Sequence, residues 1–338
     1  MILRTMAAVL FAAQALSLHA ASPTVDSIRK AGALTCGIDQ SEAEFSMTDE
    51  HGSRVNFDRD LCQAIAVAIL GSDARVVVKG YPDDTTALAA LGAGEVDLIA
   101  SVSDDFSHAA SNSIGLTRPV LYDGVALMVP RSSKVTSAAG LSGKKICFLA
   151  ETETEVNLRA WFERRHLDFV PFPFQEQGEM EAAFVTNNCS ALAGDQTRLA
   201  NARTGFGSRA RDYLILPDTI SKDPLAIAYR RNDAVFGNIA ELTIDVLVQA
   251  EESGLAMSNI AAMQASKDPA VERLLGKTHE LGRPLGLNDA WPAHVIAQVG
   301  NYGEIFRRDL GDGSPLQLPR GWNALWTEGG LMQARPLK

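Results

Sequence analysis

The stretch Ser142–Phe162, SGKKICFLAETETEVNLRAWF, changes from one regular pattern to another. Its apolar run Ile146–Leu149 is typical of a buried strand, and the apolar positions that follow have helical spacing. Thr152 or Thr154 can cap this helix, and Glu155 follows Thr152 at the spacing of a capping box. A strand that leads into a helix presents free backbone N–H groups and the positive end of the helix dipole, which favours an anion.

Two acidic residues, Glu151 and Glu153, stand in this same turn. They have two interpretations. They neutralise the helix dipole, or they change what a pocket at this turn accepts. The residues alone leave both interpretations open.

Strand and helix patterns alternate along the rest of the chain, which predicts an α/β protein with right-handed crossovers. Further strands are predicted at 33–38, 75–79, 96–101, 122–129, 168–171, 190–194, 213–216 and 225–229, with a hairpin at 45–55. Helices are predicted at 24–31, 57–70, 84–91, 154–164, 176–187, 197–204 and 233–252. From residue 268 onward the pattern is helical, with Gly and Pro between the helices.

The length, net charge and N-terminal segment of the chain exclude some classes of function. A chain of 338 residues is long enough for two domains. Its formal net charge of −10 argues against nucleic acid and against an anionic membrane surface as partners. Residues 1–21 have a positive Arg4, an apolar stretch too short to span a bilayer, and small residues at Ala20 and Ala21. They predict a cleaved signal peptide and a periplasmic or secreted protein.

Four cysteines, Cys36, Cys62, Cys147 and Cys189, allow three disulfide connectivities. Pairing neighbours in the sequence gives one bridge in each half of the chain and fits an oxidising compartment. A zinc site is the rival hypothesis, but no C-x₂-C pair is present. The sequence also lacks P-loop, G-x-G-x-x-G, G-x-S-x-G and H-E-x-x-H motifs, so we expect neither a cofactor nor a metal.

Several segments carry a resemblance to a known family. NFDRDLCQAIA, AGEVDLI, LYDGVALMV, GKKICF and NNCSALAGD resemble the periplasmic solute-binding proteins (family 3) of polar-amino-acid ABC transporters. ISKDPLAIAYRRND, VGNYGEIFRRDLG, SPLQLPRGWNALW and GGLM resemble the branch called general L-amino-acid-binding proteins. The resemblance covers nearly the whole chain after residue 21.

This resemblance implies a two-lobe periplasmic binding protein fold (type II) with a C-terminal helical extension. Two crossover strands, expected near 126–129 and 225–229, would join the lobes. Lobe 1 would consist of 22–125 and 232–338, and lobe 2 of 126–231. The lobes would close on a ligand about a hinge, and an ABC permease would recognise the closed form. The resemblance also supports the Cys36–Cys62 and Cys147–Cys189 pairings.

The family's amino-acid pocket can be carried over residue by residue. Phe45 matches the aromatic residue that covers the ligand, and Asp195 matches the acid that binds the α-ammonium group. An Asp in this position, after a strand, would otherwise be a cap for the next helix. The family's hydroxyl donors correspond to Ser101, Ser103, Thr152 and Thr154.

The carboxylate side of the pocket departs from the family. The family binds the carboxylate with an Arg just after the strand at 96–101, since a guanidinium pairs with a carboxylate bidentately. This chain has no Arg from Gly80 to Thr117, and His108 stands close to the expected position, with Asp104 and Asp105 nearby. The family's Gly-Thr-Thr turn reads Glu151-Thr152-Glu153. An ordinary amino acid should therefore bind poorly in the standard pose.

Three hypotheses follow, and we favour the first. It is a solute-binding component of an ABC importer, a monomer that takes a cationic or polyhydroxylated small molecule such as an amine. The acids that favour such a solute are Glu151, Glu153, Asp104, Asp105 and Asp195. The second is a binding fold repurposed as a periplasmic accessory or sensor protein. The third, an enzyme that resembles cyclohexadienyl dehydratases and uses His108 with Glu151 or Glu153, would still lack a cation for its substrate's carboxylate.

Overall fold

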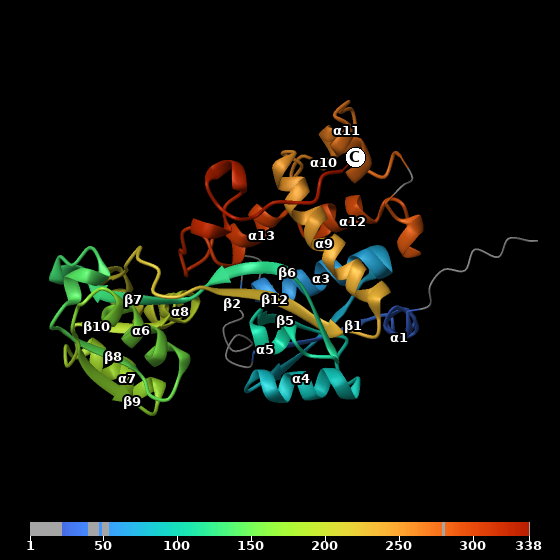
Figure 1. Cartoon of the computed structure of the whole chain (residues 1–338). Coiled ribbons are helices and arrows are strands. Elements are labelled where there is room, and N and C mark those ends of the chain that lie inside the picture. Colours follow the sequence, from blue (N-terminus) through green and yellow to red (C-terminus); the bar gives the residue numbers. More distant parts are fainter. Residues whose placement is uncertain (1–21, 40–46, 49–53, 279–280, 338) are drawn as a thin grey trace, which may run out of the picture.

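The computed structural model describes residues 22–39, 47–48, 54–278 and 281–337 (Figure 1). The predicted signal peptide and Phe45 lie outside these residues. In the described part of the chain, no helix combines the length and apolar character that a membrane crossing needs.

The first sheet has five strands in the order β4-β1-β5-β12-β6. β1 runs parallel to β4 and β5, whereas β12 runs antiparallel to β5 and β6. Its strands are β1 (Leu34–Asp39), β4 (Val76–Tyr81), β5 (Leu98–Ser103), β6 (Ile114–Asp123) and β12 (Asp223–Arg230). Helices between and beside these strands are α1 (Pro23–Ala31), α3 (Phe57–Leu70), α4 (Asp84–Ala93) and the short α5 (Phe106–Ala109). β2 (Met47–Thr48) and β3 (Arg54–Val55) form the predicted hairpin.

The second sheet also has five strands, in the order β11-β7-β10-β8-β9. Its strands are β7 (Val125–Pro130), β8 (Lys145–Leu149), β9 (Val170–Phe174), β10 (Ala191–Asp195) and β11 (Tyr213–Ile215). The helices of this part are α6 (Glu153–Arg164), α7 (Gln177–Val185) and α8 (Gln196–Gly205). Alternate residues of β7 enter two apolar clusters, one that includes Phe162 of α6 and one that includes Phe184 of α7. The sheet therefore has a core on each face.

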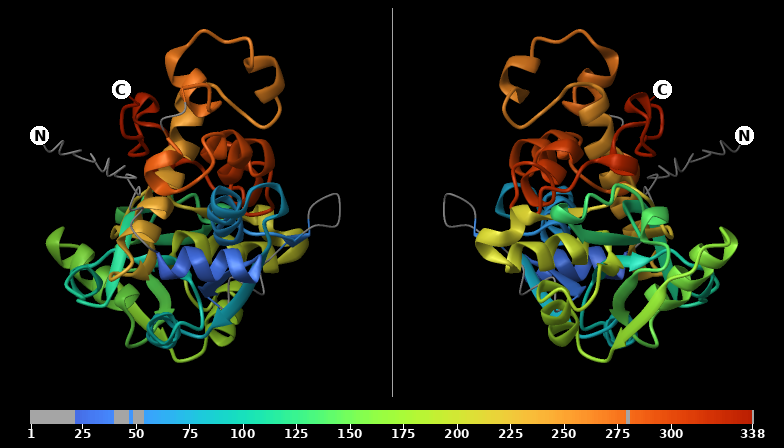
Figure 2. Two further views of the ribbon diagram at one scale, coloured as in Figure 1. Left: turned by 90° about the vertical axis from the view of Figure 1, so that its right-hand side faces the viewer. Right: turned by 90° about the vertical axis from the view of Figure 1, so that its left-hand side faces the viewer.

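The C-terminal third is helical and packs beside the first sheet. Its helices are α9 (Ala234–Glu252), α10 (Ile260–Met263), α11 (Pro269–Leu274), α12 (Trp291–Gln298) and α13 (Tyr302–Asp309). Trp291, Tyr302 and Phe306 are buried in one cluster with residues of α3 and β1. The orange segment with α10 and α11 lies outermost on this side (Figure 2). The predicted extension is thus part of the first sheet's core.

The chain passes between the two sheets twice (Figure 1). Gly124 separates β6 from β7, and residues 216–222 connect β11 to β12. The two passages are hydrogen-bonded to each other: Val125 N donates to Ser221 Oγ at 3.1 Å, and Ile220 N donates to Val125 O at 2.9 Å. The ranges in which we expected the crossings, 126–129 and 225–229, lie within β7 and β12, just after the changes of sheet.

The two disulfides follow the expected pairing. Cys36–Cys62 joins β1 to α3 with a Cα separation of 6.3 Å, and Cys147–Cys189 joins β8 to the turn after α7 with a Cα separation of 5.8 Å. Each bridge stays within one sheet and its helices. The disulfides therefore fix a helix or turn to each sheet and leave the connection between the sheets unconstrained.

Candidate functional site

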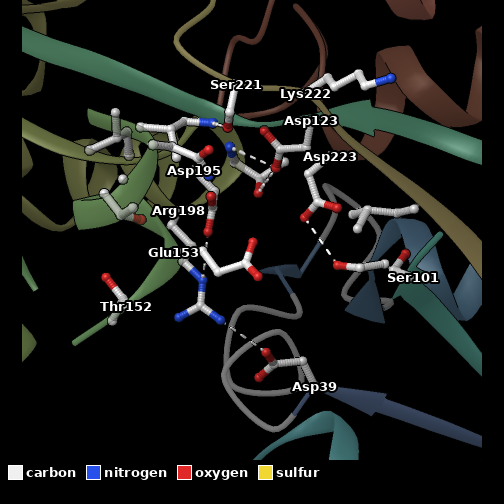
Figure 3. A pocket seen from close by; sticks show the side chains of 18 of the residues that line it. Asp39, Ser101, Asp123, Thr152, Glu153, Asp195, Arg198, Ser221, Lys222 and Asp223 are labelled. Atoms are coloured by element: carbon white, nitrogen blue, oxygen red, sulfur yellow. Dashed lines mark hydrogen bonds and ion pairs between the residues drawn. The ribbon is translucent and has the colours of Figure 1, made fainter. Parts of the chain in front are cut away.

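A cleft of about 910 Å³ lies where the two sheets meet. One side is lined by residues of β1, β5 and α5, and the other by residues of β10, α6 and α8. Residues of both passages between the sheets, Asp123 and Ser221 to Asp223, complete the lining (Figure 3). Strand ends and helix N-termini thus supply most of its polar groups, as is usual for open α/β sheets.

The lining is strongly acidic. Among the described residues, ten carboxyl side chains line it: Asp39, Asp58, Asp84, Asp104, Asp105, Asp123, Glu153, Glu181, Asp195 and Asp223. Against these stand two permanent cations, Arg198 and Lys222, and one histidine, His108. Among the described residues, no three His, Cys, Asp or Glu side chains are arranged to hold a metal ion.

The structure brings most of the sequence-predicted site residues to this cleft. Those that line it are Ser101, Ser103, His108, Thr152, Glu153, Thr154 and Asp195. Glu151 is exposed and is not part of the lining. Phe45 lies outside the described residues, so its position relative to the cleft stays a prediction.

The turn before α6 differs in detail from the predicted capping box. Thr152 occupies the N-cap position, but its hydroxyl donates to Leu149 O at 2.8 Å and caps no N–H group. The carboxylate of Glu155 accepts instead from the N–H of Glu151 at 3.1 Å and pairs with Arg159 at 2.8 Å. The capping-box prediction was therefore wrong by one residue, because Glu151 adopts a left-handed conformation (φ 60°) and presents its N–H to this carboxylate.

His108, which stands close to the position expected for the family's Arg, is held by contacts within its own loop. Its Nδ1 lies 2.9 Å from Ser103 O and 3.3 Å from Asp105 Oδ2. Asp105 in turn caps α5 by accepting from the N–H of His108 at 2.8 Å. The imidazole is therefore held by its own loop, next to an acid.

Asp123 caps helix α8, a role that the sequence alone also allowed for Asp195. Its carboxylate accepts from Gln196 N at 3.0 Å, from Thr197 N at 3.3 Å and from Thr197 Oγ1 at 2.5 Å, all in the first turn of α8. Asp195 precedes this helix but makes no side-chain cap. Asp195 is thereby left to face the cleft.

Arg198 connects the two sides of the cleft (Figure 3). Its Nε lies 3.6 Å from Asp195 Oδ2, and one of its terminal nitrogens lies 3.2 Å from Asp39 Oδ2. Arg198 belongs to α8 of the second sheet, whereas Asp39 ends β1 of the first. Sequence reasoning missed this residue. Its position one helical turn after Asp195 was the available signal, because residues three apart share a helix face.

Burial raises the pKa of five carboxyl groups of the cleft: Asp58, Asp84, Asp123, Asp195 and Asp223. Burial raises the pKa of Asp58 to about 6, against the lowering effect of the hydrogen bond from Ser101 Oγ, and the charge of Asp39 raises it further. Burial also raises the pKa of Asp123 to about 6. The pKa of Asp223 is raised to about 6 by burial and by neighbouring acids, despite the hydrogen bond from Ser103. Negative charge is therefore costly in the empty cleft.

The empty protein should gain stability as the pH falls from about 7.5 to 5, and Asp58→Asn should remove part of this gain. The folded pKa of Asp58 lies above the ordinary 3.8. The stability from its proton is therefore complete below pH 3.8 and is lost as the pH rises through about 6. For one fully buried carboxyl group this loss is about 1 kcal/mol between pH 5 and 7.5. Urea unfolding at the two pH values measures it.

Asp73→Asn is the matched control, because Asp73 is exposed and lies outside the cleft lining. It removes the same charge and should leave the pH dependence as in the wild type. Since the other cleft acids are present in both variants, their contributions cancel. A pH dependence of Asp58→Asn equal to that of the control would contradict the raised pKa of Asp58.

Comparisons with known proteins find relatives over nearly the whole chain. A scan against models of protein families finds no match. The chain is 36% identical over 324 residues to the general L-amino acid-binding periplasmic protein AapJ of Rhizobium johnstonii, covering 94% of each chain. It is 34% identical over 321 residues to the glutamate/glutamine/aspartate/asparagine-binding protein BztA of Rhodobacter capsulatus, again covering 94% of each.

A solved structure extends the likeness to the fold. An ABC transporter periplasmic binding protein from Brucella ovis with glutathione bound has 34% sequence identity and a TM-score of 0.79. The match covers 93% of this chain and 98% of that chain. These relatives are named as binding proteins rather than enzymes, against the dehydratase hypothesis. The chain belongs to the periplasmic binding proteins of amino-acid ABC transporters.

Proposed function

We propose that this protein binds a cationic small solute in the periplasm and delivers it to an ABC importer by closing two lobes. The single observation that carries this proposal is the charge of the cleft, whose described residues supply ten carboxyl groups and two permanent cations. A cation entering this cleft is attracted by the whole lining, and an anion is repelled by it. The preferred solutes are amines without a free carboxylate, with polyhydroxylated molecules as a second class.

The solutes named for the relatives differ in charge from the solutes proposed here. Amino acids and glutathione, named for AapJ, BztA and the Brucella ovis protein, carry carboxylates as well as an ammonium group. In this chain Arg198, the cation next to Asp195, is already paired with Asp195 and Asp39. A solute carboxylate would therefore compete with two fixed acids for one guanidinium, in a negative field.

The residues have separate proposed roles. Asp195 binds the cationic group of the solute, and Glu153, Asp104 and Asp105 add to the negative potential. The hydroxyl groups of Ser101, Ser103, Thr152 and Thr154 supply hydrogen bonds. Phe45 covers the solute as in the family. His108 holds the α5 loop at the rim, and Glu151 stays outside the cleft.

We propose the two sheets with their helices as the two lobes. The pairing of β12 with β5 and β6 of the first sheet supports an end of the second lobe near residue 221 instead of the expected residue 231. The hinge then consists of Gly124 and Ser221–Lys222. A monomer, exported through the signal peptide at 1–21, would present the closed lobes to a permease in the inner membrane.

A thermal-shift panel with the mature protein tests the proposed solute class. It contains agmatine, putrescine, butylamine, glutamate, leucine, glutathione and neutral sugars. A solute at a hundredfold excess over its dissociation constant stabilises the fold by about 2.7 kcal/mol. We expect amines to raise the melting temperature and the carboxylate-bearing solutes to leave it unchanged.

Two results would overturn the proposal. A strong shift with glutamate, leucine or glutathione would mean that a carboxylate is accepted despite the acidic lining. No shift with any member of the panel would favour the accessory or sensor role. In that case the acidic surface would face a protein partner.

A further inference from the structure

The C-terminal extension also contacts a helix of the second sheet. The guanidinium of Arg203, on α8, donates to the backbone oxygen of Leu316, which follows α13 in the extension. Ala200, three residues earlier on α8, is completely buried in the apolar cluster that includes Tyr302 and Phe306 of the extension. A hydrogen bond and apolar packing therefore join α8 to the extension.

This contact lies on the side of the passages between the sheets that faces away from the cleft. In Figure 1 the red segment after α13 lies above these passages, whereas α5 and α7, which supply lining residues of the cleft, lie below them. The faces of α8 agree with this placement. Asp195, Arg198 and Ala202 line the cleft, whereas Ala200 and Arg203 share a different face of the helix.

The N-terminal end of α8 is attached to the proposed hinge. Gln196 N donates to Gly124 O at 3.0 Å, and the carboxylate of Asp123 accepts from N–H groups of the first turn. The cleft face of α8 and the face that contacts the extension thus lie on opposite sides of the hinge. A rotation about the hinge that narrows the cleft moves Arg203 away from the extension.

The segment of the extension that α8 contacts, 314–323, is attached to the first sheet and its helices. Arg320 pairs with Glu251 of α9 at 2.9 Å. The side-chain amide of Asn323 accepts from the N–H of Tyr122 at 2.7 Å and donates to the backbone oxygen of Tyr122 at 2.9 Å. Segment 314–323 therefore stays with the first sheet when the second sheet rotates.

Resting on the proposed closing of the lobes, we infer that segment 314–323 opposes this closing through its contact with α8. The hydrogen bond from Arg203 to Leu316 O and the packing of Ala200 are present with the wider cleft and are lost as the cleft narrows. They stabilise the open arrangement, because a contact that exists in one of two states shifts the equilibrium toward that state. A solute that binds the closed lobes must offset this contact, which lowers its apparent affinity.

The test measures the distance between the lobes in the empty protein. Spin labels on Ala89→Cys of α4 and Glu179→Cys of α7, both exposed positions, report this distance by pulsed electron paramagnetic resonance. Arg203→Met keeps an apolar stem and removes the donors, and it should raise the population of the shorter distance about threefold. Arg209→Met, the same substitution at an exposed Arg, is the matched control and should leave the distances as in the labelled parent protein.

Ala200→Leu tests the packing independently. The added carbons need space between α8 and the extension, so they should force these apart and also favour the shorter distance. Agmatine added to the labelled parent protein tests the proposed closing by the same measurement.

A shorter distance with agmatine, but unchanged distances in empty Arg203→Met and Ala200→Leu, would overturn the role of segment 314–323 and leave the proposed function standing. A shorter distance in the two variants, with no effect of agmatine or any other solute of the thermal-shift panel, would support that role and count against the proposed solute class. Unchanged distances in every case would overturn both.

Discussion

Replacing Asp195 with alanine should lower the affinity for the proposed cationic solute by at least about a hundredfold. The Asp195 carboxylate lines the cleft and caps no helix, since Asp123 caps α8. Removing one partner of a desolvated charge pair costs about 2–5 kcal/mol, and 2.7 kcal/mol corresponds to a hundredfold change. Calorimetric titration with the best amine of the thermal-shift panel measures the loss.

The fold should tolerate this change, because the bond that Asp195 makes to Arg198 is a half-exposed ion pair and contributes little to stability. Asp212→Ala is the matched control: Asp212 is an exposed acid in the same half of the chain and does not line the cleft. It should bind the amine like the wild type. Unchanged affinity in Asp195→Ala would remove Asp195 from the proposed site.

Local pattern was sufficient to predict most elements of the fold. The helix predicted at 57–70 has those bounds in the structure, and the alternation of strands and helices is confirmed. The apolar run predicted as one strand at 122–129 is divided at Gly124 between β6 and β7, which belong to different sheets. Periodicity reports that a residue is extended and buried. It does not report which sheet the residue joins, because that depends on partners far away in the sequence.

The contacts within the cleft were less predictable, because they also join residues that are far apart in the sequence. The resemblance placed Asp195, but it could not reveal that Asp123, from a distant strand, takes over the capping of α8. Arg198 has the sequence context of an ordinary helix residue, and its contact with Asp39 exists only once the sheets meet. Asp58 looks like a helix N-terminal acid, a common and unremarkable position. That its Oδ2 is buried without a hydrogen bond to any described residue is visible only in three dimensions.

The second large effect concerns the proposed hinge at Gly124. Gly124→Ala should destabilise the protein by about 3 kcal/mol or more, since both backbone strain and overpacking contribute. Gly124 has φ +144°, and a Cβ atom there would lie 2.2 Å from Ser221 O in the other passage between the sheets. The three atoms nearest to this Cβ all belong to the backbone of Ser221 and Lys222, so no side chain can move aside. The two passages must therefore separate, which breaks the bonds between Val125 and residues 220–221.

Gly143→Ala separates this steric effect from the general cost of a left-handed alanine. Gly143 has φ +70° with no atom within 4 Å of the added carbon, so its replacement should cost only about 1–2 kcal/mol. Urea unfolding compares the two variants, and small-angle scattering of the empty protein reports the lobe arrangement. Gly124→Ala should alter the scattering curve and Gly143→Ala should not. Equal stability losses in the two variants, together with identical scattering curves, would contradict a hinge at Gly124. Such results would mean that the added carbon at residue 124 does not change how the two sheets are joined.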